Sequence, residues 1–489
     1  MKPWRFYGRN DQMHALSEML TRRRWFFAKV SGRRRIGKTG LIQQALATAG
    51  TGQRVLYMQV PDSEPVGVLS VLNDAFDTFA IPTDQFPRPQ NLAQFAKSIE
   101  ALANAGYTLV LDEFQYFNRK GYEEFCSHLQ AVVDRLSARA DQVPGGLIVL
   151  GSIHTEMQAL LEDRTAPLYN RVTDTIDLTH WEIASLLEML TEHADTSPAR
   201  LLFLWNLFEG VPKFYRDCYE QGVLAADRPT LLRRIFFESS SPLRAEADNW
   251  FLRELRGRYD VVLKFVARHP GQMHNQLVQA VRTASNDPDT QISGYLKVLI
   301  DRFQLIERKL PIFAKPDARR SRYYLADNFL RSWLAAVANP VSAIAFRPLD
   351  QLVREADQRL ETVEGWALEE LAGQLYQERS RRGLGDFPLT RRMEGYWDKS
   401  DTEIDLVAVN EDDRVIRFGA CKRSPSKLIS DVNHFQGHVE RFLTALPQYR
   451  SWRVEYAAIA PSLDLSQRAI LEHHDMIPQD LNDLTAGLL

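Results

Sequence analysis

The sequence contains few cysteines and no long apolar run. The three cysteines are scattered and form neither a disulfide framework nor the spacing of a zinc site; they are Cys126, Cys218 and Cys421. No stretch of about eighteen consecutive apolar residues occurs, which excludes a membrane-spanning helix. The first residues, MKPWRFYGRNDQ, lack the apolar core of a secretion signal. We therefore expect a cytoplasmic protein that does not associate with membranes.

The chain also lacks a strong excess of either charge. Its formal net charge is −3 over 489 residues, so any binding of nucleic acid must come from local basic patches. No internal repeat and no low-complexity tract is present. A chain of this length is too long for one hydrophobic core, and we expect three or four domains.

The clearest motif in the chain is a phosphate-binding loop. The apolar run WFFAKV precedes the pattern G-x-x-x-x-G-K-[ST], and an amphipathic helical pattern follows it. The backbone N–H groups of such a loop face phosphates, Lys38 reaches the β- and γ-phosphates, and the Thr39 hydroxyl ligates Mg²⁺. The residues predicted to surround bound ATP or ADP are Gly32, Arg33, Arg34, Arg35, Ile36, Gly37, Lys38, Thr39 and Gly40.

Two acids at the end of a second apolar run, YTLVLDEFQYF, complete the predicted site. Asp112 would hold Mg²⁺ through water, and Glu113 would orient or deprotonate the attacking water. A third run, GGLIVLGSIHTEM, is expected to form a strand between the first two. Ser152 at its end either senses the γ-phosphate or the lytic water, or caps the following helix. The two acids predict hydrolysis as well as binding.

The surrounding sequence predicts an α/β ATPase core. RVLYMQV and VTDTIDL are expected to complete a five-stranded parallel sheet with helical crossovers. We place this core at residues 1–190. Apolar residues at intervals of three and four then predict a helical lid over residues 191–250.

These motifs resemble the P-loop ATPases of the STAND and AAA+ group, and specifically the archaeal-type ATPase family. FYGRNDQMHAL, GRRRIGKT, APLYNRVTDTIDL and FEGVPKFY are similar to motifs of that family. The resemblance implies that Gly8 and Arg9 border the adenine. It also implies that Gly210 and Pro212 lie where the lid meets the nucleotide, although this Gly-x-Pro is alternatively a simple turn. Arg171 becomes a candidate γ-phosphate sensor or finger, unless it pairs with a surface acid.

Residues 251–338 have the pattern of a winged helix-turn-helix. Three predicted helices precede two strands, LIERKL and RYYLAD, which flank a basic tip. If DNA is bound, the third helix would enter the major groove. The outer face of this helix is predicted to present Gln291, Tyr295, Lys297 and Arg302. The residues of the tip available to phosphates are Lys315, Arg319, Arg320 and Arg322. In the STAND group such a module can instead contact proteins.

Residues 345–489 read as helix, three strands, helix and strand, after a Pro-containing linker that begins at Asn339. This is the core order of PD-(D/E)XK nucleases. The segment also resembles the uncharacterised C-terminal domain usually fused to the archaeal-type ATPases, on the motifs YWDK, EIDLVAV and GACKR. We therefore expect a restriction-endonuclease-like α/β domain.

The catalytic set of that nuclease is incomplete in this sequence. Asp405 and Lys422 are present and Glu364 could supply the helical acid, but Ala420 occupies the position of the central acid. Magnesium needs oxygen ligands, so its affinity and the activity should fall, by about 10²-fold or more. Glu403, on the same strand face as Asp405, is one conceivable replacement. We predict a nuclease fold with lost or very weak activity; an active nuclease is the alternative.

Together these observations predict an ATP-binding and ATP-hydrolysing switch that uses Mg²⁺. DNA is the predicted partner of the winged helix and of the C-terminal domain, where Lys422, Arg423 and Lys427 could hold it. Two alternatives remain: an ATP-gated nuclease that requires Mg²⁺, and a signalling switch that contacts only proteins. Oligomer formation on ATP binding is a further expectation.

Overall fold

The computed structural model describes the residue ranges 2–50, 54–244, 246, 259–285, 292–315, 320–399 and 401–489. These divide into two compact units. The first comprises Gly8–Trp181 with Val211–Lys213, and the second comprises Met1–Tyr7, Glu182–Gly210 and Phe214–Leu489. The sheet of the predicted ATPase core therefore lies in the first unit. The segments predicted as lid, winged helix and nuclease-like domain all lie in the second, apart from the three residues Val211–Lys213.

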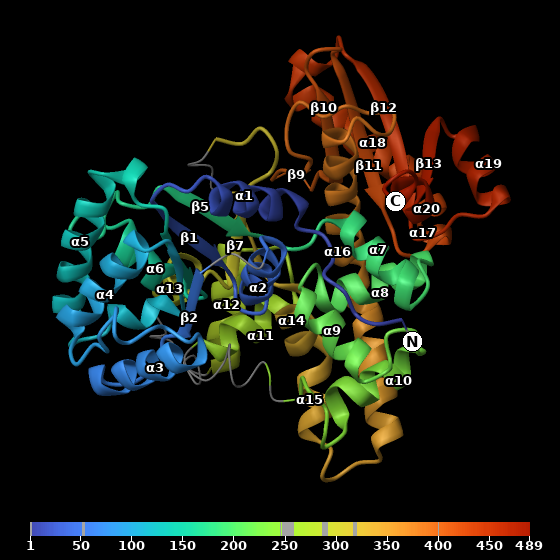
Figure 1. The fold of residues 1–489 in the computed structure, drawn as a ribbon. Coiled ribbons are helices and arrows are strands. Elements are labelled where there is room, and N and C mark those ends of the chain that lie inside the picture. Colours follow the sequence, from blue (N-terminus) through green and yellow to red (C-terminus); the bar gives the residue numbers. More distant parts are fainter. Residues whose placement is uncertain are drawn as a thin grey trace. The chain divides into compact units, whose positions relative to one another are not determined.

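The first unit is built on the predicted five-stranded parallel sheet (Figure 1). Its strand order is β2-β3-β4-β1-β5, so β4 lies between β3 and β1 as expected. All residues of β3 and β4 are buried, which explains their continuous apolar sequences. The strands are β1 (Phe26–Gly32), β2 (Arg54–Gln59), β3 (Tyr107–Asp112), β4 (Gly146–Gly151) and β5 (Asp174–Leu178).

Helices connect these strands because parallel strands require long crossovers. Helix α4 packs against both α5 and β3, and Figure 1 shows it beside α5. The core between them contains stacked phenylalanines, with ring centroids of Phe117 and Phe125 4.3 Å apart. The helices are α1 (Asn10–Thr21), α2 (Lys38–Thr48), α3 (Pro65–Thr78), α4 (Leu92–Asn104), α5 (Glu123–Ser137) and α6 (His154–Leu161), with the 3₁₀ turns η1 (Phe114–Asn118) and η2 (Ala140–Gln142).

The segment after the sheet is helical, as predicted. Its helices are α7 (Ile183–His193), α8 (Pro198–Phe208), α9 (Pro212–Glu220) and α10 (Arg228–Leu232), followed by the π-helical turn η3 (Arg233–Phe237). Proline at the start of α8, α9 and α10 suits the first turn of a helix, where its missing N–H leaves no hydrogen bond unmade.

The region predicted as a winged helix contains the expected helices and strand pair, with one additional short strand. Its sheet has the order β6-β8-β7. The elements are α11 (Asp260–Arg268), β6 (Gln272–Met273), α12 (His274–Ser285), α13 (Ile292–Asp301), β7 (Ile306–Lys309) and β8 (Arg322–Leu325). Helical turns follow at α14 (Asn328–Ser332), η5 (Trp333–Val337) and α15 (Ala338–Ser342). The expected linker from Asn339 is therefore partly helical.

A second five-stranded sheet forms the C-terminal part, with the order β13-β12-β11-β10-β9. β9, β10 and β11 pair antiparallel, whereas β11, β12 and β13 pair parallel. The strands are β9 (Glu394–Trp397), β10 (Glu403–Asn410), β11 (Val415–Cys421), β12 (Arg453–Ala460) and β13 (Met476–Asp480). The predicted order of helix, three strands, helix and strand is present, and β13 extends it.

The helices of this part are amphipathic or short. They are α16 (Leu349–Arg381), α17 (Pro425–Ser430), α18 (Val432–Ala445), α19 (Leu465–His473) and α20 (Leu481–Thr485), with the 3₁₀ turn η6 (Pro447–Tyr449). Even α16, with 33 residues, carries charged side chains throughout. No helix within the described ranges is long and apolar enough to cross a membrane.

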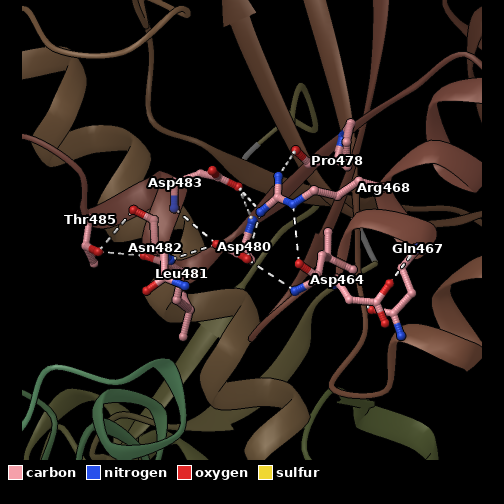
Figure 2. A network of polar contacts seen from close by, with 10 residues as sticks. Asp464, Gln467, Arg468, Pro478, Asp480, Leu481, Asn482, Asp483 and Thr485 are labelled. Carbon is pink, nitrogen blue, oxygen red and sulfur yellow. Dashed lines mark hydrogen bonds and ion pairs between the residues drawn. The ribbon is translucent and has the colours of Figure 1, made fainter.

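A polar network around Arg468 stabilises the last helix, α20 (Figure 2). Arg468 on α19 forms ion pairs of 2.7 Å with Asp480 and 2.8 Å with Asp483. Asp480 also caps α20, accepting hydrogen bonds from the backbone N–H groups of Asn482 and Asp483. These contacts satisfy the first N–H groups of a five-residue helix that would otherwise be too short to persist.

A charge cluster around the buried Arg331 joins α16 to the strand pair of the second unit. Glu370 accepts hydrogen bonds of 3.0 Å from Lys309 on β7 and 3.0 Å from Arg331 on α14. Burial alone would raise the pKa of Glu370, but Arg331 and Lys309 lower it to about 2. Because Arg331 is only 1% exposed, its charge depends on this carboxylate.

We expect Glu370→Gln to destabilise the second unit by about 3 kcal/mol, since it leaves the buried Arg331 charge uncompensated. A carboxyl with a lowered pKa stabilises the fold above its ordinary pKa and loses that effect as pH falls through its folded pKa. The difference from wild type should therefore be full at neutral pH and shrink as pH falls from 4.5 towards 2. Thermal unfolding measures it, with Glu361→Gln on the exposed face of α16 as control. Equal melting temperatures at neutral pH would contradict the prediction.

Candidate nucleotide site and C-terminal acidic cluster

The phosphate-binding loop connects β1 to α2, and its glycines are required by its geometry. Gly37 has a φ of 97°, a left-handed conformation that favours glycine. At Gly32, a Cβ atom would lie 2.6 Å from the carbonyl oxygen of Leu178. Glycine at position 32 therefore lets the loop approach β5 closely, and glycine at position 37 allows the left-handed turn before α2.

Lys38 lies inside the curve of this loop. Its Nζ donates hydrogen bonds of 2.8 Å to the carbonyl oxygen of Gly32 and 3.0 Å to that of Arg33. Burial lowers the pKa of Lys38 to about 8, although the carboxylates of Glu113 and Asp112 act in the opposite direction. A buried ammonium that is held by carbonyl oxygens is well placed to exchange them for phosphate oxygens.

Thr39 and Asp112 come together at the carboxyl ends of β1 and β3. The Thr39 hydroxyl donates a 2.7 Å hydrogen bond to Asp112 Oδ2. Tyr57 on β2 donates a second one, also of 2.7 Å, to the same oxygen. Burial, followed by the contact with Asp112, raises the pKa of Tyr57. The hydroxyl and carboxylate oxygens fit Mg²⁺, a cation that prefers such ligands. Sequence reasoning missed Tyr57, because a tyrosine in an apolar strand carries no functional pattern.

Glu113 and Ser152 are also brought together. Ser152 Oγ donates a 2.9 Å hydrogen bond to Glu113 Oε2. The N-cap of α6 is Ile153, so Ser152 does not have the capping role that was its alternative. Glu113 has a φ of 57°, which is uncommon outside glycine and concentrates at functional sites. The side chain of Gln115 contacts both residues and was not predicted.

Two of the residues implied by family resemblance lie at the loop. Arg9 donates hydrogen bonds to the carbonyl oxygens of Ile36 and Thr179. The ring of Pro212 lies 3.9 Å from the position that a Cβ atom of Gly37 would occupy.

The other resemblance-based residues are Gly8, Gly210 and Arg171. Gly8 precedes Arg9 with a φ of 63°. Gly210 belongs to the second unit. Arg171 pairs with Asp134 on α5 through hydrogen bonds of 2.7 and 3.0 Å, which is the surface pairing named as its alternative.

Two residues of the basic tip, Arg320 and Arg322, contact the C-terminal sheet. Arg322 donates hydrogen bonds of 2.6 and 3.1 Å to Glu403, and its guanidinium lies 4.6 Å from the ring centroid of Trp397. Trp397 in turn donates a 2.7 Å hydrogen bond to the carbonyl oxygen of Arg320. The Ile312 N–H donates to the carbonyl oxygen of Gly395. In this arrangement Arg322 neutralises an acid, and Glu403 is committed to that ion pair.

The remaining DNA-binding candidates differ in their surroundings. Lys297 and Lys315 are exposed. Tyr295 is half-buried, and its ring packs edge-on against Tyr259 with the centroids 5.2 Å apart. Arg302 is exposed and lies over the ring of Phe303. Gln291 and Arg319 lie outside the described residues.

An acidic cluster with one lysine lies where β10 begins and β11 ends. Asp405 Oδ2 accepts hydrogen bonds of 2.8 Å from the Cys421 N–H and 3.1 Å from Lys422 Nζ. Burial raises the pKa of Asp405, although Lys422 opposes the change. Burial and the neighbouring Asp405 raise the pKa of Glu369 well above its usual range. The charges of Glu369 on α16 and Asp405 therefore influence each other.

Glu364, the helical acid expected from the sequence, has a different role. Its carboxylate is only 2% exposed and pairs with Arg228 and Arg423. Five residues along an α-helix correspond to about 500°, so Glu364 and Glu369 lie on different faces of α16. The signal that could have found Glu369 is the pair Glu369–Glu370 inside an otherwise apolar stretch of α16.

The C-terminal cluster lacks one carboxylate, because Ala420 occupies the position of the central acid. It is 6% exposed and belongs to the apolar core of the sheet. Within the ranges that the structure describes, no three His, Cys, Asp or Glu side chains converge closely enough to hold a metal ion. The cluster therefore holds an aspartate, a lysine and a glutamate without the geometry of a metal centre.

Comparison by sequence shows which known proteins the chain is similar to. Residues 333–457 match the DUF234 family, described as archaeal and bacterial proteins of unknown function. An uncharacterised protein of Methanocaldococcus jannaschii is 23% identical over 493 residues, which cover 98% of this chain and 100% of that protein. The match to DUF234 agrees with the predicted likeness of the C-terminal part to an uncharacterised domain.

Solved structures show what the fold is similar to. A Walker-type ATPase of Pyrococcus abyssi is 16% identical, with a TM-score of 0.52 over 67% of this chain and 96% of that one. The ORC2 protein of Aeropyrum pernix, in complexes with ADPNP and ADP, is also 16% identical, with a TM-score of 0.45 over 74% of this chain and 96% of that one. The first of these confirms the predicted P-loop ATPase fold, which here is followed by a separate mixed sheet.

Proposed function

We propose that this protein binds Mg²⁺–ATP in the first unit and hydrolyses it. The observation that carries the proposal is the contact between Thr39 and Asp112 beside a buried Lys38, at the edge of the sheet where the phosphates would lie. These groups supply a metal ligand, a carboxylate that would hold the metal through water, and a cation for the β- and γ-phosphates. Glu113 on the same strand end supplies the base or orienting group for water.

The Walker-type ATPase fold supports the same proposal. We further propose that nucleotide turnover switches the arrangement of the two units, and that an oligomer forms on ATP binding. The direct test is phosphate release from ATP by the purified chain, with Mg²⁺ and with the metal removed by chelation. Turnover that needs Mg²⁺ is the expected result. Failure to bind ATP in the presence of Mg²⁺ would contradict the proposal.

DNA binding by the second unit is our second proposal. It is favoured by Lys422 beside Asp405 and by the exposed Lys427 nearby in sequence, in a domain whose predicted relatives act on nucleic acid. A lysine can hold a phosphodiester without a metal, whereas cleavage by this fold needs several carboxylates. We therefore propose that the C-terminal domain binds DNA and does not cleave it. The paired Arg322 and Glu403 would have to separate before that arginine could reach a phosphate.

The experiment is a combined cleavage and gel-shift assay with supercoiled, linear and single-stranded DNA in Mg²⁺ or Mn²⁺. Wild type should shift DNA in a salt-dependent manner without cutting it. Asp405→Ala removes the acid that accepts from Lys422, and should strengthen the shift because it leaves that lysine free for phosphate. Asp412→Ala, in the exposed turn between β10 and β11, is the control.

Cleavage that disappears in Asp405→Ala would show that the domain is an active nuclease despite Ala420. An absence of both cleavage and shift would favour the third function, a switch that contacts only proteins.

A further inference from the structure

Gln115 is a buried polar residue among aromatic neighbours. It lies in the 3₁₀ turn η1 and is 2% exposed. Phe114 and Phe117 of the same turn are also buried. Burying an amide is costly unless its hydrogen bonds are made within the protein. An apolar residue would therefore suit this position better, unless the amide serves the neighbouring site.

The hydrogen bonds of the Gln115 side chain go to the two polar residues of the predicted hydrolytic site. Its Nε2 donates to Glu113 Oε2 and, at 3.4 Å, to Ser152 Oγ. Its Oε1 accepts a 3.3 Å hydrogen bond from the Ser152 N–H. Ser152 Oγ completes the ring by donating to Glu113 Oε2 at 2.9 Å. The amide therefore links the end of β3 to the end of β4.

The atoms around this ring of hydrogen bonds leave the Gln115 side chain little room to move. A Cβ atom on Gly151 would lie 2.9 Å from Gln115 Oε1 and would also meet the side chain of Met157. Glycine at this position lets the amide approach the end of β4 closely. Because the amide is buried and held at both ends, it can fix the direction of a flexible glutamate side chain.

We propose that Gln115 is the positioning residue for Glu113 in ATP hydrolysis; this inference rests on the proposed function. Two donors hold Glu113 Oε2, so the carboxylate presents Oε1 to the attacking water. The water oxygen forms a bond to the γ-phosphorus, and the bond from that phosphorus to the β–γ bridging oxygen breaks. ADP leaves, and the proton of the water passes to Glu113 Oε1. Gln115 itself touches neither nucleotide nor water.

The test is Gln115→Met, which keeps the length and burial of the side chain but removes its donors and acceptor. We expect kcat for ATP to fall by about 10-fold to 100-fold, because the base is no longer held in one orientation. KM and the affinity for ATP should stay within about threefold of wild type, since Lys38 and Thr39 are untouched. The control is Gln158→Met on the exposed face of α6, and thermal unfolding with and without ATP checks that each variant is folded.

A double variant separates positioning from a structural role. If Gln115 acts through Glu113, Gln115→Met should change the residual turnover of Glu113→Gln by less than about twofold. An additive loss, or a parallel rise in KM, would overturn the assignment. If Gln115→Met is folded and its kcat equals that of wild type, this inference alone is overturned. Absence of turnover in wild type would instead overturn the proposed hydrolysis and the inference with it.

Discussion

Replacing Lys38 with alanine is expected to abolish measurable ATP binding and turnover. The ammonium is buried and held by the carbonyl oxygens of Gly32 and Arg33, so bound phosphate would form a poorly hydrated ion pair with it. Truncating one partner of such a buried pair costs about 3 kcal/mol, or on the order of 100-fold in affinity. Titration with a fluorescent ATP analogue measures the affinity, and phosphate release measures the turnover.

The matched control for this variant is Lys97→Ala, which removes an exposed lysine from α4 in the same unit. It should leave both quantities unchanged. The pH dependence supplies a second check, because the pKa of Lys38 is lowered to about 8 and only its charged form attracts phosphate. ATP affinity of wild type should be constant below that pH and fall above it. Normal turnover by folded Lys38→Ala would remove the loop from the mechanism.

Glu113→Gln should retain ATP and lose its hydrolysis. The amide cannot accept the proton of water, and a general base contributes about 10²-fold to 10⁴-fold to a rate. We expect kcat to fall by at least about 100-fold while the affinity for ATP stays within a few-fold of wild type. Single-turnover phosphate release and a binding titration on the same preparation separate the two effects.

Glu124→Gln on the exposed face of α5 is the control for the loss of one carboxylate. If phosphate release by Glu113→Gln matched that of wild type, Glu113 would have no part in the reaction. The inference on Gln115 would then fail too, because that residue is argued to act only through Glu113.

The nucleotide site was largely predictable because its motifs are local and its strands are parallel. The spacing from Gly32 to Thr39 describes one loop, whose shape depends on its own glycines. Asp112 lies far from Thr39 in sequence, yet both follow parallel strands, and the carboxyl ends of such strands meet at one edge of the sheet. The predicted place of β4 between β1 and β3 was confirmed, and the parallel strands bring the two side chains to their 2.7 Å contact.

The partners of individual side chains were not predictable in this way. Tyr57 and Gln115 belong to no motif, and their contacts with Asp112 and Glu113 depend on how β2 and η1 pack beside β3. On α16 the sequence offered several acids, and only the fold showed that Glu364 pairs with Arg228 and Arg423, whereas Glu369 interacts electrostatically with Asp405.

The sequence by itself determined the P-loop, the strand pattern and the order of the segments, because glycine spacing and apolar periodicity act on the local backbone. Tertiary structure alone decided that Arg322 neutralises Glu403, residues 81 positions apart on two elements of the second unit. Ion pairs of this kind depend on packing between distant segments, and they produce no repeating pattern in the sequence. Of the basic tip that looked available for DNA, Arg322 is accordingly paired within the protein, and this pairing could be seen only in the folded chain.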